Sequence, residues 1–351
     1  MSQRVETAPG VAPGINRPVA LWLLVCMGWV LLIAVVGGIT RLTGSGLSIP
    51  EWAPLRGVLP PITSEDWVHA FDLYRASPQY LEINRGMTMD AFRTIFWWEW
   101  IHRLIARATG LVYALPLLVL WRRGHLPTRH LPAYLAVLVL GGLQGVIGWL
   151  MVRSGLGDQP FVSPLKLAMH LGLALIIASL LAALLVRRTL TLPPPPPRLR
   201  LLALVTWALL WVQCLLGALV AGLRAGWLCP TWPKMCSVWV PWDTLVAARW
   251  DVLSNPWVAQ FVHRWWAVVA TLAVFATAAL IGRAHPTRTG RPIAATLVGL
   301  VLAQFGLGVW TLLSGMSTSI AVTHQAVGII LLVVVAGVSA WPTRAGGSAP
   351  S

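Results

Sequence analysis

Four of the eight histidines lie in strongly apolar stretches, where an imidazole ring is costly unless it binds a partner. These four are His102, His170, His263 and His324. The remaining histidines lie in polar, arginine-containing or proline-containing segments and are interpreted as surface groups. One isolated histidine would favour a hydrogen bond between helices. Four of them at corresponding positions favour a binding site instead.

The four histidines belong to two copies of one sequence pattern. The recurring landmarks are Ile101-His102-Arg103 with Val262-His263-Arg264, the Gln144 to Gly148 segment with the Gln304 to Gly308 segment, Ser154-Gly155 with Ser314-Gly315, and His170 with His324. Each copy therefore supplies two histidines from two different apolar stretches. The glycines at 145, 148, 306 and 308 suit close approach of a helix to a neighbouring helix or ring.

Two imidazoles that face each other match the two axial positions of a haem iron, and a four-helix bundle can enclose the macrocycle. Zinc and copper usually need more protein ligands, and no Cys, Met or carboxylate recurs beside both histidine pairs. The sequence therefore predicts one haem site in each copy.

The two copies differ at one ionisable position. Glu99 precedes the first histidine by three residues and shares its helical face, whereas the equivalent residue of the second copy is Gln260. A carboxylate beside such a site could act as a general base or stabilise positive charge. Alternatively, it could form a salt bridge with Arg103 or Arg107 of the same helix.

The apolar stretches that carry the histidines are long enough to be membrane-spanning helices. Hydrophobic residues make up 57% of the 351-residue chain and charged residues 11%. A helix needs about 20 apolar residues to cross a bilayer, and lipid offers no partner for an unpaired backbone. The predicted spans are 19–40, 98–121, 131–152, 165–188, 199–222, 257–282, 293–313 and 320–341. The predicted fold is all-α, with eight transmembrane helices in two pseudo-symmetric four-helix bundles.

The proline run Pro193–Pro197 separates the two copies, because an uninterrupted run of prolines cannot continue a helix. We therefore expect a first half over residues 1–192, a linker over 193–197 and a second half over 198–351. No cleavable signal is expected near the amino terminus, so that the first apolar stretch is predicted to be a retained helix.

Short connections that contain several arginines and no acidic residue predict the cytoplasmic side of the membrane. The long segments 41–97 and 223–256 then lie in the periplasm. The predicted haem sites lie toward the periplasmic side, and both termini are cytoplasmic. This arrangement is typical of a bacterial inner-membrane protein. The net charge of +15 is divided among these separate loops and forms no basic face, which argues against nucleic-acid binding.

Two further segments resemble the haem A synthase family in its proteobacterial and mitochondrial branch. One runs from Asn84 to Leu104 and contains the specific Trp97-Trp98-Glu99-Trp100-Ile101-His102-Arg103 motif; the other runs from Gly37 to Ser48. Together with the spans and the four histidines, the resemblance covers nearly the whole chain.

The resemblance implies an enzyme that oxidises the C8 methyl group of haem O to a formyl group, through a hydroxymethyl intermediate, to make haem A for cytochrome oxidase. His102 and His170 would flank haem O in the first half, while His263 and His324 would ligate a haem b cofactor in the second. Glu99 matches the essential glutamate of the family, which would stabilise a carbocation-like intermediate or guide water to the oxidised methyl group.

The resemblance also implies haem O synthase as a partner, a lipid membrane as surroundings, and an electron acceptor that is unknown. It is compatible with a homo-oligomer. Two other classes stay open, a bis-histidine di-haem electron carrier and a transporter. The difference between Glu99 and Gln260 favours the enzyme, because a carrier needs no carboxylate beside only one haem.

Cys229 and Cys236 lie in the second long segment, where an oxidising compartment makes a disulfide plausible. Related enzymes of other branches carry such a pair in the first half, but residues 49–55 contain none. The bridge would be a structural staple or a redox relay, and the absence of visible partner thiols favours the staple. Cys26 and Cys214 lie within apolar spans and are interpreted as core residues.

Overall fold

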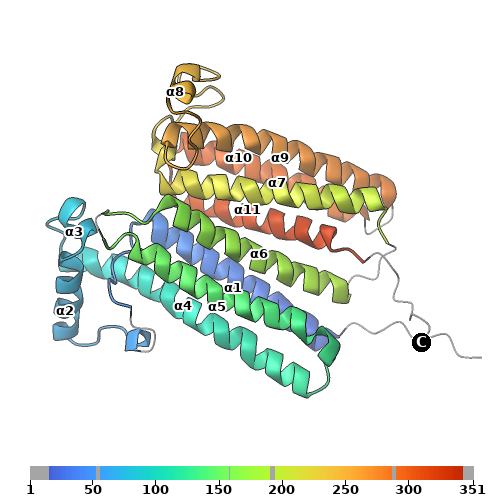
Figure 1. Cartoon of the computed structure of the whole chain (residues 1–351), viewed down its shortest axis with the longest axis horizontal. Helices are drawn as coiled ribbons and strands as arrows, with labels where there is room; N and C mark the ends of the chain where they lie inside the picture. Colours follow the sequence, from blue (N-terminus) through green and yellow to red (C-terminus); the bar gives the residue numbers. More distant parts are fainter. Residues whose placement is uncertain (1–15, 53–55, 158, 190–193, 287–289, 343–351) are drawn as a thin grey trace, which may run out of the picture.

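The computed structural model describes residues 16–52, 56–157, 159–189, 194–286 and 290–342. In this part of the chain, eight helices are long and apolar enough to cross a membrane (Figure 1). They are α1 (Arg17–Leu42), α4 (Met89–Arg122), α5 (Leu131–Arg153), α6 (Pro164–Thr189), α7 (Pro197–Gly222), α9 (Pro256–Ala284), α10 (Gly290–Leu313) and α11 (Thr318–Ser339). The prediction of an all-helical, multi-pass membrane protein is confirmed.

The remaining elements are short and lie in the connections. They are α2 (Ser64–Arg75), α3 (Pro78–Glu82), α8 (Trp242–Ala247) and the 3-10 turns η1 (Arg56–Val58), η2 (Thr128–His130) and η3 (Ala225–Trp227). Figure 1 shows α2, α3 and α8 at one end of the bundle, at the left of the view. We call the end that carries segments 43–88 and 223–255 the loop end.

The helix α4 begins at Met89 rather than near residue 98, which is the one large difference from the predicted spans. The Thr88 side chain accepts a hydrogen bond from the Ala91 N–H and caps the helix at this point. The added turns are not apolar enough to resemble a membrane span, but their inner face is buried. Phe92 and Phe96 pack there in an aromatic cluster with residues of α2.

Prolines start three of the spanning helices, because proline lacks the N–H that a first-turn residue leaves unbonded. They are Pro164, Pro197 and Pro256. Pro197, the last residue of the expected linker, is therefore the first residue of α7. Pro193 lies outside the described residues.

Helices from both parts of the chain meet at the centre of the bundle. In Figure 1, α7, α9, α10 and α11 occupy the upper side, and α1, α4, α5 and α6 the lower side. The contacts between the two groups are made by α1 and α6 with α7 and α11. Gln325 on α11 donates from Nε2 to the Ala34 carbonyl of α1 at 2.8 Å. The division into two pseudo-symmetric halves stays a prediction.

Candidate functional site

The four singled-out histidines come from four different helices and lie in two pairs. His102 on α4 lies within electrostatic range of His170 on α6. His263 on α9 lies within the same range of His324 on α11. All four side chains are half-buried. Each predicted pair is therefore brought together across the bundle, from two helices that do not pack closely against each other.

Each histidine ring rests against a glycine on the spanning helix that precedes it in the chain. These contacts join Gly37 to His102, Gly148 to His170, Gly217 to His263 and Gly308 to His324. A Cβ atom on the glycine would lie 2.9 Å from Cε1 of the ring in three cases and 3.1 Å in the pair formed by Gly217 and His263. Ordinary van der Waals contact begins at about 3.4 Å, so any larger residue would push the ring.

The glycine prediction is confirmed at two positions, whereas no neighbouring helix in the described part of the chain approaches the other two. Gly148 and Gly308 contact histidine rings, but a Cβ at Gly145 or Gly306 would meet no atom within 4 Å. The ring-facing glycines of α1 and α7 were not singled out by the sequence pattern. Gly37 opens the family-like segment from Gly37 to Ser48, and each glycine lies in the spanning stretch just before a half-buried histidine.

In each pair, a glutamine side chain contacts the ring of one histidine. Gln144 Nε2 lies 3.2 Å from Nδ1 of His170 and donates to the His170 carbonyl at 2.9 Å. Gln213 Nε2 lies 3.2 Å from Nδ1 of His263 and donates to the His263 carbonyl at 3.1 Å. These side chains therefore limit the rotation of both rings from one side.

The other two histidines lack a side-chain partner of this kind. His324 Nδ1 lies 3.2 Å from the Gln304 carbonyl oxygen and must donate to it, which leaves the Nε2 lone pair available to a metal. His102 Nδ1 is buried without a hydrogen-bond partner among the described residues.

The donor set fits a haem iron. Each pair offers two imidazoles from facing helices, with a glycine beside each ring that leaves room for it. Within the described ranges, no group of three or more His, Cys, Asp or Glu residues could hold a metal ion. Zinc sites usually need three or four such ligands, whereas a haem iron needs two axial ones.

Glu99 is 2% exposed, and its carboxylate contacts both the loop after α1 and an arginine of its own helix. Its Oε2 accepts from the Ser48 hydroxyl at 2.7 Å and from the Ile49 N–H at 2.9 Å. Its Oε1 accepts from Arg103, whose Nη2 lies at 2.7 Å. Arg103 also donates to the carbonyls of Ile49 and Glu51. The predicted salt bridge therefore exists, with Arg103.

Gln260 and Arg264 hold the other long loop in a corresponding way. Gln260 Nε2 donates to the Cys229 carbonyl at 3.2 Å, and Arg264 Nη2 donates to the same oxygen at 2.6 Å. Arg264 also donates to the Thr231 carbonyl at 3.0 Å. Gln260 Oε1 and Arg264 Nε are buried without partners in the described structure. Position 260 thus serves as a donor to its loop, whereas position 99 serves as an acceptor.

The loop that Gln260 and Arg264 hold is closed by a disulfide. Cys229 and Cys236 are bonded, with their Cα atoms 5.4 Å apart, so the predicted pairing is confirmed. Cys26 is buried and unpaired, and Cys214 is half-buried and unpaired. The contacts around Cys229 are those of a staple, but its chemical role stays a prediction.

Known proteins resemble this chain over most of its length. The family model COX15-CtaA, described as cytochrome oxidase assembly protein, matches residues 20–336. A protein of Rhizorhabdus wittichii named "Heme A synthase" is 44% identical over 328 residues, which cover 90% of this chain and 92% of the relative. A protein of the same name from Caulobacter vibrioides is 42% identical and covers 94% of this chain and 97% of its own length. The chain therefore belongs to the COX15-CtaA family, the family of the haem A synthases.

Proposed function

We propose that this chain is a haem A synthase, a membrane oxidoreductase that converts the C8 methyl group of haem O into the formyl group of haem A. The observation that carries the proposal is the pairing of His102 with His170 and of His263 with His324, each ring lying against a glycine. Membership of the family supports it.

The two pairs take different haems in this proposal. His102 and His170 hold the substrate, haem O, in the half that contains Glu99. His263 and His324 hold haem b as a resident cofactor, which supplies one-electron oxidation and reduction when bound. Gln144 and Gln213 orient one ring of each pair. Gln144 lies on α5, the third spanning helix of its group, whereas Gln213 lies on α7, the first spanning helix of the other group.

The reaction removes four electrons and four protons from the methyl group and one water, because a CH₃ group plus H₂O contains four more hydrogens than a CHO group. The electrons leave to an acceptor. Glu99 is the carboxylate on α4 nearest in sequence to the substrate pair, and Arg103 neutralises its charge. In the proposed reaction, Glu99 accepts a proton from water or stabilises positive charge at the oxidised carbon.

The loop end lies in the periplasm in this proposal, and both termini lie in the cytoplasm of a bacterial inner membrane. The arginines of the opposite end, including Arg187 and Arg188 at the end of α6, support this orientation. A bis-histidine haem site in each half, over residues 1–192 and 198–351, follows from the same arrangement. Haem O synthase is the expected upstream partner.

The test is haem extraction from membranes of a host that lacks haem A and expresses this chain together with a haem O synthase. Chromatography should show haem A for the wild type. The Glu99→Gln variant should lose most of it, because the amide cannot accept a proton as a carboxylate does.

A matched variant separates chemistry from structure at this position. Ser48→Ala removes one donor to the Glu99 carboxylate but keeps the carboxylate and its pairing with Arg103. If Glu99 acts on the substrate, haem A formation should survive in Ser48→Ala and fail in Glu99→Gln at equal levels of folded protein.

The electron carrier is the second candidate, because the structure shows Glu99 engaged in a salt bridge and loop contacts. A carrier would yield only haem B and haem O in this host, with an intact di-haem spectrum. That result would reject the synthase.

A further inference from the structure

Two arginines meet at the loop end, where the two groups of helices adjoin. Arg41, in the last turn of α1, donates from Nη2 to the Ala221 carbonyl near the end of α7. Arg224, just beyond α7, lies over the Phe161 ring, with Cζ 3.7 Å from the ring centroid. The positive charge of Arg224 acts on Arg41. Partial burial lowers the pKa of Arg224 below its ordinary value.

Neither arginine has an acidic partner in the described part of the chain. The salt bridges there are Arg75–Asp72, Arg93–Asp90 and Arg103–Glu99. Two guanidinium groups that are near each other and partly removed from water are unfavourable unless an anion joins them. Guanidinium groups bind carboxylate and phosphate oxygens with paired hydrogen bonds.

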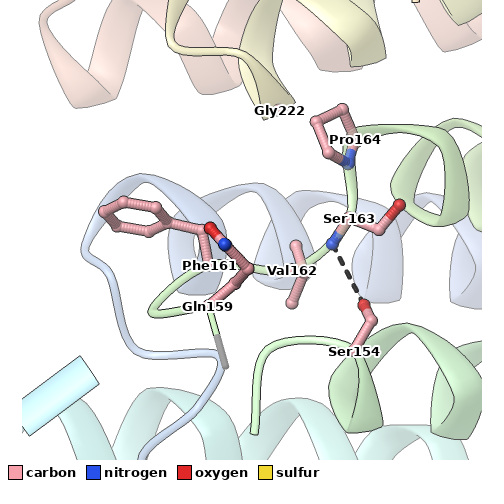
Figure 2. Close-up of a pocket in the computed structure, with 7 residues that line it drawn as sticks. All are labelled: Ser154, Gln159, Phe161, Val162, Ser163, Pro164 and Gly222. Carbon is pink, nitrogen blue, oxygen red and sulfur yellow. Dashed lines mark hydrogen bonds between the residues drawn. The ribbon is translucent and has the colours of Figure 1, made fainter. Parts of the chain in front are cut away.

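An open cavity of about 370 Å³ lies beside these contacts, although neither arginine lines it. Figure 2 shows that its wall is made by the connection from α5 to α6, with Gly222 of α7 on the other side. The Ser163 N–H donates to Ser154 Oγ at 3.0 Å and fixes this connection. Arg41 binds the carbonyl next to Gly222, and Arg224 covers the ring of Phe161, which lines the cavity.

The arginines stand just beyond the histidine pairs, toward the loop end. Arg41 follows Gly37, the glycine against His102, by four residues, which is about 6 Å along the same face of α1. Arg224 lies about two turns beyond Gly217, the glycine against His263. Because charged propionates are costly in hydrocarbon, a haem held at this depth would be expected to turn them toward the loop end, where these arginines lie.

We propose that Arg41 and Arg224 form a carboxylate-binding site for the propionate groups of the haem held between His102 and His170. The proposal rests on the proposed function, because it assumes that haem O occupies that pair. The first pair is favoured over the second because Arg41 lies on the helix that faces His102, and the cavity is built by the connection that leads into the helix of His170. Arg224 reaches this site from the other group of helices.

A phospholipid phosphate at the membrane surface offers the same chemistry and is the competing source of an anion. The test titrates purified full-length protein in detergent with haem O and with its dimethyl ester, in which both propionates are uncharged, and follows the absorbance. A charged hydrogen bond contributes about 1.5–3 kcal/mol, so the ester should bind roughly 10- to 100-fold more weakly to the wild type.

The Arg41→Gln and Arg224→Gln variants should bind haem O more weakly by a similar factor and should no longer distinguish the acid from the ester. Arg75→Gln is the control, because Arg75 lies on α2 at the same end of the bundle and is paired with Asp72. It should keep the wild-type preference. An unchanged haem b spectrum would show that a variant is folded.

Equal binding of acid and ester by the wild type would overturn the proposal, whichever variants fold. That outcome is expected if the arginines serve an acidic residue of their own chain. Native mass spectrometry would show whether the arginine variants lose bound phospholipid. Such a loss, with unchanged haem O binding, would assign the site to a lipid and reject the propionate proposal. Failure of the wild type to make haem A would instead reject the proposed function.

Discussion

The second histidine pair can be tested by adding one methyl group at Gly308. In Gly308→Ala the new Cβ would lie 2.9 Å from Cε1 of His324, whereas ordinary contact begins at 3.4 Å, so the ring must retreat by 3.4 − 2.9 = 0.5 Å. A free imidazole can swing aside at little cost. A ring whose Nε2 is bound to iron cannot, because its position is fixed at both ends.

In Gly308→Ala, we expect the free energy of haem binding to weaken while the free energy of unfolding of the haem-free protein changes little. Forcing an extra methyl group into a packed site costs about 1–3 kcal/mol, which corresponds to a loss of haem affinity of roughly 5- to 140-fold. Gly306→Ala is the matched control, since a Cβ there meets no atom within 4 Å. Both variants replace glycine by alanine in the same helix, so they share the gain of about 1 kcal/mol in helix propensity.

The assay is a titration of the purified full-length variants with haem b, with thermal unfolding of the haem-free proteins measured in parallel. Gly306→Ala should keep wild-type affinity and the low-spin spectrum of bis-histidine ligation. Gly308→Ala should lose affinity while its haem-free form unfolds at a similar temperature. Equal haem affinity in the two variants would refute the argument that His324 is an iron ligand held against this glycine.

Three further outcomes follow from contacts of the described residues. Gln213→Leu removes the amide that donates to the His263 carbonyl and lies beside its ring; the less firmly oriented ring should bind the second-half haem roughly 10-fold more weakly in a titration. Cys229→Ser opens a bridge that spans seven residues and should destabilise its loop by roughly 2–3 kcal/mol in a proteolysis assay, while haem A formation survives if the bridge is a staple. Thr88→Ala removes the cap of α4 at the Ala91 N–H and should speed hydrogen exchange in the first turns of this helix, with a loss of about 1 kcal/mol.

The sequence predicted the eight spans well because a bilayer leaves few alternatives for a long apolar stretch. The start of α4 was the exception. Residues 89–97 continue this helix beyond the apolar stretch, and Phe92 and Phe96 are buried by α2 rather than by lipid. A hydropathy pattern cannot show this extension, because it depends on a tertiary contact with a loop helix.

The four histidines could be selected from the sequence because an imidazole in an apolar stretch needs a partner. Their surroundings could not be predicted as well. The contacts of Gly37 and Gly217 depend on how each helix is rotated toward its neighbour, and a weakly amphipathic helix carries little information about that rotation. The hydrogen bond from Gln325 to the Ala34 carbonyl depends in the same way on how α1 meets α11.

The difference between Glu99 and Gln260 has a structural cause in addition to any chemical one. The first loop presents donors to position 99, the Ser48 hydroxyl and the Ile49 N–H, so an acceptor is required there. The second loop presents the Cys229 carbonyl to position 260, so a donor is required. A glutamine at 99 would turn an N–H₂ group toward one set of donors, and a glutamate at 260 would face a carbonyl oxygen. Because Arg103 occupies the other oxygen, the loop and Arg103 together require the carboxylate before any substrate binds. The asymmetry supports the enzyme only as far as Glu99→Gln and Ser48→Ala differ in haem A formation.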